Sequence, residues 1–412
     1  MSFRETVAIT ALALFLEVAC GSQVLAKDGP ERAPSPMVTI CHKPGTPAEQ
    51  TMMINLNALG AHLGHGDLEG PCVLIDVHNH LPRGVSVDHL VSLINEAGVA
   101  MVVLMPVFYG ANDPNGQGID ENLVLDFYRQ QPDRIILFLG MQRPVLLNVN
   151  RWQYPDVPAE NLLRFTENQL RTGLFRGMGE FIIRHYPYSL RDGEAVGGEV
   201  TIAADTPLMR RFLDLAVAYD VPVTIHYEVD SESLASLLSM LEYGRQATII
   251  LAHNCGRPDP ETLRALLERY PNLNCDLGGM TPRGLYGSLT PRGGQQPKNP
   301  LDDGQGHLRP EWRVLFEQYP NRFVGIGTDL AHPDVWENRG SYTDQIKIFR
   351  SWLSDLSLGT AQHIAFQNAR KLFKLNMHLI CHEPGGHSER GIWVDADSLS
   401  AHLQHVDRLG GC

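Results

Sequence analysis

Apolar stretches alternate with helix-period segments along the middle of the chain, between residues 73 and 375. The apolar stretches predict strands near 73–78, 100–105, 134–140, 174–180, 222–227, 248–253, 272–277 and 323–328. The segments between them predict helices near 87–97, 120–131, 158–172, 206–220, 231–243, 259–270, 310–319 and 341–373, the last broken around Gly359. Strands and helices that alternate in this way indicate an α/β fold, a closed (β/α)8 TIM barrel, whose chemistry takes place at the carboxyl ends of its strands.

The first predicted strand ends in two histidines. The stretch VLIDVHNHLP at 73–82 places His78 and His80 two residues apart, so both side chains leave the strand on one side while Asn79 points away. Two neighbouring imidazoles suggest a metal ion, but polar residues also occur wherever a strand meets a loop. This stretch alone leaves both interpretations open.

Four other predicted strands also end in residues that can bind a metal. They are Glu180 in GMGEF, His226 in TIHYE, His253 in LAHNCG and Asp329 in GIGTDL, on the fourth, fifth, sixth and eighth predicted strands. Any one of them alone is an ordinary loop residue. Because the carboxyl ends of barrel strands meet at one mouth, these side chains are expected close to His78 and His80. The sequence therefore predicts a metal centre there.

A repeat encloses the predicted barrel. The segments ICHKPGTPAEQTMMINLNALGAHLGHGDLEGPC at 40–72 and ICHEPGGHSERGIWVDADSLSAHLQHVDRLGGC at 380–412 align without a gap. Both keep the same spacing of cysteines and histidines, which are Cys41, His42, His62, His65 and Cys72 in the first copy and Cys381, His382, His402, His405 and Cys412 in the second. This spacing indicates one small Cys/His module present twice.

The cysteines of the repeat allow two interpretations. A disulfide within each copy would gain roughly 3–4 kcal/mol from loop closure and suits an exported protein. The alternative is a structural zinc site, because His-x-x-His on a helix flanked by cysteines resembles a tetrahedral ligand set. Two further cysteines, Cys255 and Cys275, end the sixth and seventh predicted strands and are either free thiols or a pair.

The N-terminus indicates export. Arg4, the apolar run at 7–16 and VLA at 24–26 together resemble a signal peptide cleaved after Ala26, so a periplasmic or secreted location is expected. The expected organisation is a signal peptide at 1–26, a linker at 27–37, the first Cys/His module at 38–72, the barrel at 73–376 and the second module at 377–412. No other segment is long and apolar enough to span a membrane.

The net charge of the chain indicates which kind of molecule the protein binds. A formal charge of −13 over 412 residues argues against binding along a nucleic-acid backbone, which requires a basic surface. A small-molecule substrate is expected instead. The oligomeric state is left open, and a homodimer is compatible with the sequence.

The ordered set of strand-end residues resembles the amidohydrolase superfamily, in particular the amidohydrolase-related branch that includes aminocarboxymuconate semialdehyde decarboxylase. The resemblance covers about 73–375 and includes FQNARKLFKL at 366–375, which is similar to the closing helix of that branch. It implies that His78, His80, His226 and Asp329 hold a divalent metal, expected to be Zn²⁺. It also implies that His253 is the catalytic histidine, because the sixth-strand histidine of such proteins acts in proton transfer or binds a second metal.

Glu180 leaves the number of ions open. Related metal-dependent deoxyribonucleases place a bridging glutamate on the fourth strand, and GMGEF looks similar, so Glu180 is a further candidate ligand. Members with a single metal also carry acidic residues at this place. One ion is favoured, and a second, bridged by Glu180, stays open.

The resemblance implies a metal-dependent hydrolase that cleaves an amide, ester or lactone bond with a metal-activated water. In that reaction Asp329 takes the proton of the water, and His253 polarises the carbonyl or protonates the leaving group. A non-oxidative decarboxylase of the same branch is the first alternative, although export argues against it. The second is a non-catalytic secreted binding protein, because a fold does not prove a function.

Two long loops on the expected active face are rich in glycine, proline and polar residues. They are 181–205, with Arg184, His185 and Tyr186, and 278–309. Loops of this length are usually functional or disordered, which suggests a lid over the substrate. Arginines that could meet a substrate carboxylate are Arg143, Arg184, Arg257 and Arg283, although most loop arginines are simply solvated.

Overall fold

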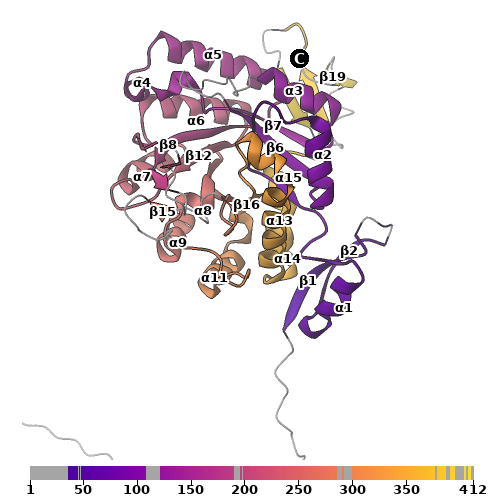
Figure 1. Ribbon diagram of the computed structural model, residues 1–412. Helices are drawn as coiled ribbons and strands as arrows, with labels where there is room; N and C mark the ends of the chain where they lie inside the picture. The colour runs from indigo at the N-terminus through magenta and orange to yellow at the C-terminus, as the bar shows by residue number, and fades with distance from the viewer. Residues whose placement is uncertain are drawn as a thin grey trace, which may run out of the picture. The chain divides into compact units, whose positions relative to one another are not determined.

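Eight parallel strands close into a barrel in the computed structural model (Figure 1). They follow one another in space in chain order and are β4 Ile75–Asp76, β6 Met101–Pro106, β7 Ile135–Leu139, β8 Gly177–His185, β12 Val223–Tyr227, β13 Ile249–Leu251, β14 Leu273–Gly278 and β16 Phe323–Gly327. The last strand, β16, pairs with β4 and closes the ring. The predicted (β/α)8 fold is confirmed.

The structure describes residues 36–44, 46, 48–107, 121–189, 195–196, 198–284, 290–291, 299–375, 378–386, 390–394, 403–404 and 407–409. The predicted signal peptide lies outside these residues, as do His402, His405 and Cys412 of the second repeat. Among the described residues, no helix combines the length and the apolar character needed to cross a bilayer.

A helix follows each barrel strand, close to where it was predicted. These helices are α2 Val87–Glu96, α3 Glu121–Gln130, α5 Val157–Arg171, α6 Pro207–Tyr219, α7 Leu234–Tyr243, α9 Pro260–Arg269, α11 Pro310–Gln318 and α13 Arg339–Ser354. Local signals fix several starts: Asp156, Thr206 and Asp259 each cap a helix N-terminus through a side-chain oxygen, with proline in the first turn. The last predicted helix is interrupted at 355–357 and continues as α14 Leu358–Gln362, a π-helical turn at His363–Gln367 and α15 Asn368–Leu372.

The core follows the two-residue period of the strands. In β7, Ile135, Leu137 and Leu139 belong to the large cluster that packs against the surrounding helices. The alternate residues Ile136 and Phe138 belong to a second, smaller cluster that includes residues of four other barrel strands. The helix α15 supplies Ala369 to this inner cluster, and Phe373 after it places its ring 5.2 Å from that of Phe138. The chain after the last barrel strand therefore contributes to the filling of the barrel interior.

The strand β8 is longer than predicted. It continues beyond Glu180 to His185 and pairs with the antiparallel strand β11, Val200–Thr201, so residues 181–185 are strand and not loop. The two long loops also meet, because β9 Tyr188–Ser189 pairs with both β10 Ala195–Val196 and β15 Thr290–Pro291. A small three-stranded sheet thus connects the 181–205 and 278–309 segments.

The first repeat folds as a small antiparallel sheet with a short helix. Its elements are β1 Met37–His42, β2 Gln50–Asn55, η1 Leu56–Ala58, α1 Leu59–Gly64 and β3 Leu68–Glu69. The second repeat has the same sheet order, with β17 His378–His382 between β18 Arg390–Val394 and β19 Arg408–Leu409. A disulfide joins Cys41 to Cys72 and confirms the disulfide interpretation for the first copy. Cys381 is also disulfide-bonded.

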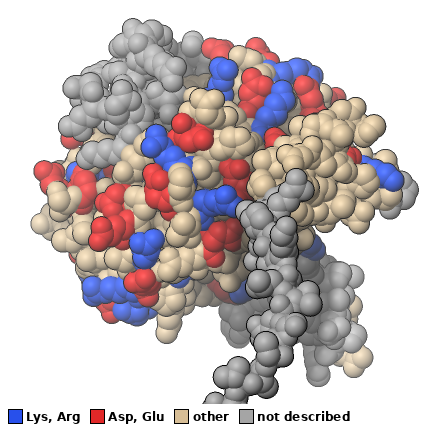
Figure 2. Space-filling model, turned by 90° about the horizontal axis from the view of Figure 1, so that it is seen from below, with Lys and Arg blue, Asp and Glu red and all other residues tan. Residues whose placement is uncertain are grey.

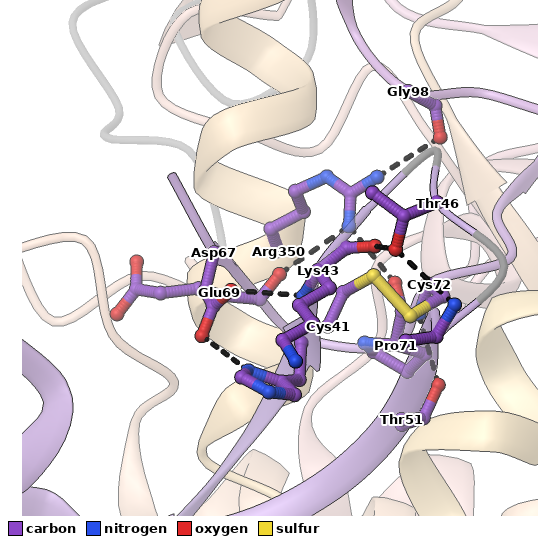
Figure 3. The surroundings of a disulfide bond; sticks show 12 residues. Cys41, Lys43, Thr46, Thr51, Asp67, Glu69, Pro71, Cys72, Gly98 and Arg350 are labelled. Atoms are coloured by element: carbon purple, nitrogen blue, oxygen red, sulfur yellow. Dashed lines mark hydrogen bonds and ion pairs between the residues drawn. A yellow bond between two sulfur atoms is a disulfide. The ribbon is translucent and has the colours of Figure 1, made fainter. Parts of the chain in front are cut away.

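Arg350 on α13 holds the first repeat against the barrel (Figure 3). Its guanidinium donates to the carbonyl oxygens of Pro71 at 2.9 Å, Gly98 at 2.9 Å and Glu69 at 3.3 Å. In the second repeat, β18 lies against α5. The two copies therefore rest on different helices of the barrel.

Candidate metal centre

The six residues predicted from the strand ends are all buried at the carboxyl end of the barrel. None is more than 8% exposed, and they are His78, His80, Glu180, His226, His253 and Asp329. The first predicted strand is divided into β4 and a second short strand, β5 His80–Leu81. The rings of His78 and His80 both lie in the centre, with their centroids 5.3 Å apart. Asn79 between them turns away and accepts hydrogen bonds from Thr328 and Leu330.

The first group of donor atoms surrounds a common point. The Nε2 atom of His80 lies 3.4 Å from Glu180 Oε2 and 3.4 Å from Asp329 Oδ1, and the Nε2 atom of His78 lies 3.7 Å and 3.5 Å from the same two oxygens. Ligands at about 2.0–2.2 Å from a tetrahedral ion are separated by roughly 3.3–3.6 Å, so these separations suit a shared metal. Buried His78 Nε2 has no hydrogen-bond partner among the described residues. The donor set therefore fits a divalent ion.

Asp276 fixes the orientation of His78. Its Oδ2 lies 2.9 Å from His78 Nδ1, while its Oδ1 accepts the backbone N–H groups of His253 at 3.1 Å and Gly278 at 2.8 Å. A carboxylate only accepts, so His78 Nδ1 carries the proton and Nε2 offers its lone pair to the centre. The sequence prediction named no residue on the seventh strand. The signal was an acidic residue inside the apolar stretch NLNCDLGG.

A second group of donors shares Glu180. Its Oε1 lies 3.0 Å from His253 Nε2 and 3.3 Å from His226 Nδ1, and these two nitrogens are 2.9 Å apart. The other ring nitrogens face groups that can only accept, Gly278 O for His253 and the carboxylate of Glu228 for His226. Two lone pairs therefore face each other, which requires a positive charge between them, either a proton or a metal ion.

The carboxylates and imidazoles of the centre shift one another's pKa. Burial disfavours the charged form of His226, but Glu180 and Glu228 outweigh burial and raise its pKa to about 9. Burial would raise the pKa of Glu180, yet the neighbouring histidines hold it well below its usual range, and Asp329 is shifted in the same direction for the same reason. Both carboxylates are therefore ionised, and the centre attracts cations.

The turn after β13 has an unusual backbone. His253, Asn254 and Cys255 adopt left-handed conformations, with φ of 57°, 53° and 57°. This conformation costs a residue with a side chain about 1 kcal/mol or more, and such strain collects at functional sites. Cys255 is held by a disulfide to Cys275 on β14, so these two cysteines are a pair. The buried amide of Asn254 has no hydrogen-bond partner among the described residues.

Three of the four arginines proposed to meet a substrate carboxylate already face carboxylates of the chain. Arg143 pairs with Glu121, Arg184 with Asp230, and Arg257 with Glu228, whereas Arg283 is exposed. The pairing of Arg257 with Glu228 is buried and lies directly behind His226. These contacts engage the three guanidinium groups with carboxylates of the chain itself.

His185 lies behind the second group of donors. Its ring centroid is 4.9 Å from that of His226, and its Nδ1 lies 2.9 Å from the carbonyl oxygen of Gly198. Burial, with the charge of His226, lowers the pKa of His185 to about 3. The imidazole is therefore neutral at physiological pH, and His185 belongs to strand β8 and not to a loop.

The chain belongs to the amidohydrolase family, because residues 75–375 match the family described as Amidohydrolase. This family is metal-dependent, and the clustered histidines and carboxylates form a candidate metal site of the kind it requires. The assignment of individual residues as ligands or as proton carriers stays a prediction. No curated protein matches the sequence.

Several solved structures have a similar fold. One is 2,6-dihydroxybenzoate decarboxylase complexed with 2,6-dihydroxybenzoate, at 18% identity and a TM-score of 0.42, covering 75% of this chain and 99% of that chain. The same enzyme from Rhizobium has 16% identity and a TM-score of 0.41 over 75% and 99% of the two chains. A 4-oxalomesaconate hydratase from Rhodopseudomonas palustris has 12% identity and a TM-score of 0.42 over 73% and 96%. At this distance the similarity does not indicate the reaction.

Proposed function

We propose that this protein is a metal-dependent hydrolase that cleaves an amide, ester or lactone bond of a small molecule. The observation that carries the proposal is the position of Glu180, whose two carboxylate oxygens each face one group of histidines. His78, His80, Asp329 and Glu180 would hold a divalent ion, with Zn²⁺ favoured by the mixture of imidazole and carboxylate ligands. When bound, such an ion lowers the pKa of a water molecule to about 7, which makes hydroxide available near neutral pH.

Two residues are proposed to move protons. Asp329 is ionised and its Oδ1 lies 3.4 Å from His80 Nε2, so the carboxylate is placed to receive the proton of the attacking water. His253 is fixed through Nδ1 on the carbonyl of Gly278, which leaves Nε2 as the atom that donates a proton to the leaving group. The neighbouring Asn254 has a buried side-chain amide with no hydrogen-bond partner among the described residues, and this amide is proposed to donate to a carbonyl oxygen of the substrate.

The second group of donors bears on the number of ions. A metal between His226 Nδ1, His253 Nε2 and Glu180 Oε1 would make the centre binuclear, whereas a proton there would leave one ion. Metal analysis of the purified protein distinguishes the two, since it returns two equivalents at this centre in the first case and one in the second.

We also infer that the protein is exported. Two disulfides among the described residues, Cys41–Cys72 and Cys255–Cys275, point to an oxidising environment. Together with the predicted signal peptide they support a periplasmic or secreted location. Mass spectrometry of the N-terminus of the native protein tests this, and a chain that still begins at Met1 would contradict it.

The reaction is tested by assaying the Zn²⁺-loaded protein on a panel of lactones, aryl esters and aminoacyl amides. CO₂ release from hydroxybenzoates is followed in parallel. We expect hydrolysis that falls at least ~10²-fold in Asp329→Ala and His253→Ala and is unchanged in the control His65→Ala, whose side chain is exposed in the first repeat. CO₂ release without hydrolysis would establish the decarboxylase alternative. Turnover that survives Asp329→Ala would overturn the mechanism.

A further inference from the structure

The first repeat contains a second histidine and carboxylate cluster, separate from the barrel centre. Asp67 lies between two imidazoles, with its Oδ2 at 2.8 Å from His42 Nδ1 and 2.7 Å from His62 Nδ1. The rings meet edge to face with centroids 5.6 Å apart. The Asp67 side chain is almost fully buried, whereas each histidine side chain is about one quarter exposed, at 25% and 27%. The cluster is therefore rigid at its base and open to solvent on its outer side.

The backbone orients the carboxylate of this cluster. Asp67 Oδ1 accepts the backbone N–H of Lys43 at 2.9 Å (Figure 3). Its Oδ2 is left to face the two imidazoles. His42 ends strand β1 and His62 lies on helix α1, so two different elements meet at one oxygen. The disulfide Cys41–Cys72 ties the end of β1 to the end of the repeat and keeps these elements together.

This geometry changes the choice of metal ligands in the repeat. The sulfur atoms of Cys41 and Cys72 are bonded to each other and are not available as thiolates, so the predicted Cys-His zinc set does not form. The remaining donors are two imidazole nitrogens and one carboxylate oxygen, a set that suits Zn²⁺ and Cu²⁺ and does not suit Ca²⁺ or Mg²⁺. His65, three residues after His62, has an exposed side chain and lies outside the cluster.

The present distances are those of hydrogen bonds, and an ion requires only a small adjustment. Donor atoms at about 2.0–2.2 Å from a tetrahedral ion stand roughly 3.3–3.6 Å apart, so each imidazole would move by less than about 1 Å. Each nitrogen would exchange its proton for the ion. Because both histidines are partly exposed, this movement meets little packing resistance.

The second repeat reproduces half of the cluster independently. His382 Nδ1 lies 2.9 Å from Asp407 Oδ2, and Asp407 Oδ1 accepts the backbone N–H of Glu383 at 2.9 Å. These contacts match those of His42, Asp67 and Lys43 in distance and in atom type. The sequence places His402 at the position of His62, although it lies outside the described residues.

We propose that the first Cys-His repeat binds one divalent transition-metal ion, Zn²⁺ or Cu²⁺, through two histidines and one aspartate, which are His42, His62 and Asp67. The ion would lie where the end of β1 meets α1, beside Asp67. The repeat is then a metal-binding module that is independent of the barrel centre and of the reaction proposed for it.

The proposal is tested by metal stoichiometry on the full chain. The apo protein is titrated with Zn²⁺ by calorimetry, and Cu²⁺-loaded protein is analysed by pulsed electron paramagnetic resonance, which counts coordinated imidazoles. We expect His62→Ala to bind one equivalent fewer than the wild type. His65→Ala, the matched control on the same helix, should bind the full number.

The outcomes decide between a metal site and a purely hydrogen-bonded cluster. Full stoichiometry in His62→Ala would overturn the proposal. Intact-mass measurement of the Cys41–Cys72 disulfide verifies the fold of each variant. If His62→Ala fails to fold, His42→Ala replaces it. The electron paramagnetic resonance spectrum of the Cu²⁺-loaded wild type is a further test of the ligands. A repeat site with fewer than two coordinated imidazole nitrogens would contradict the assignment.

Discussion

At the scale of single residues, the orientation of the histidines depends on acceptors that the chain supplies from distant strands. Asp276 holds His78 through Nδ1, and Glu228 holds His226 through Nε2. Each acceptor decides which nitrogen of its histidine is free for a cation. The centre is therefore preorganised before any ion binds.

Replacing Asp276 by asparagine tests this orientation. The amide no longer provides two accepting oxygens for His78, His253 and Gly278, so we expect the affinity of the barrel centre for Zn²⁺ to fall about 10–100-fold. Competition with a chromophoric chelator measures the change. Asp133→Asn, at an exposed turn, is the control. Unchanged affinity in a folded Asp276→Asn protein would show that the orientation of His78 does not depend on this carboxylate.

Asp76 below the centre provides a pH-dependent test. It is fully buried, and burial raises its pKa to about 6, against 3.8 for the ordinary group, despite the hydrogen bonds from Thr328. The folded protein therefore holds a proton that the unfolded chain has lost. The contribution of Asp76 to the free energy of unfolding is greatest below about pH 4 and falls as the pH rises to about 6, by roughly 3 kcal/mol.

Urea unfolding of the wild type and Asp76→Asn between pH 4 and 7 measures this contribution. As the pH rises through this window, the free energy of unfolding of the wild type should fall relative to that of Asp76→Asn. The reason is that Asp76 ionises and asparagine does not. A difference that is constant with pH would contradict the raised pKa of Asp76.

The sequence could predict the metal-binding residue types but not their partners. His78, His80 and Asp329 follow apolar strands, and the common direction of barrel strands places them at one mouth. The partner of His78 lies 198 residues further along the chain, so no local pattern indicates it. The sequence also could not predict that the donors form two groups around Glu180, because the directions of these side chains are fixed only when the barrel is packed.

At the scale of elements, the strands and helices were predictable because each buries a periodic face. The extension of β8 to His185 was not, because its outer part is stabilised by β11, which follows only after the intervening 186–199 segment. The sequence FIIRH fits a strand or a loop equally well until that partner is known. The prediction that 181–185 is loop was wrong for this reason, whereas the lid over the two long segments stays a prediction.

The attachment of the first repeat to α13 also depends on one residue. Arg350 is 5% exposed and donates to three carbonyl oxygens, and burial lowers its pKa to about 10. Gly70 of the first repeat has φ +71°, and a Cβ there would lie 2.9 Å from the backbone oxygen of Arg350. The approach of the repeat to the barrel is therefore close and specific.

Arg350→Met tests this attachment. The substitution removes the donors and leaves the carbonyls of Pro71 and Gly98 without them, so we expect the free energy of unfolding to fall by roughly 2–3 kcal/mol. Proteolytic cleavage within 37–72 should also become faster. Arg129→Met, which removes an exposed ion pair with Asp126, should change the free energy by less than about 1 kcal/mol. Equal effects of the two substitutions would show that Arg350 does not secure the repeat.

At the scale of the whole molecule, the barrel was predictable and the placement of the repeats was not. Barrel closure follows from a regular alternation of elements, whereas the docking of a small module depends on the surface that it meets. On the face shown in Figure 2, acidic and basic side chains of the described residues are interspersed. The net charge of −13 is the sum over the whole chain, and this face is not uniformly acidic.

The central claim is that distant strand ends hold a cation at one point, and anomalous diffraction at the zinc edge tests it most directly. Crystals grown with Zn²⁺ should show an anomalous peak about 2.0–2.2 Å from His78 Nε2, His80 Nε2 and Asp329 Oδ1. A second peak beside His226 Nδ1 and His253 Nε2 would show that the centre is binuclear. Zn²⁺ bound elsewhere in the crystal, with no peak among these side chains, would contradict the account.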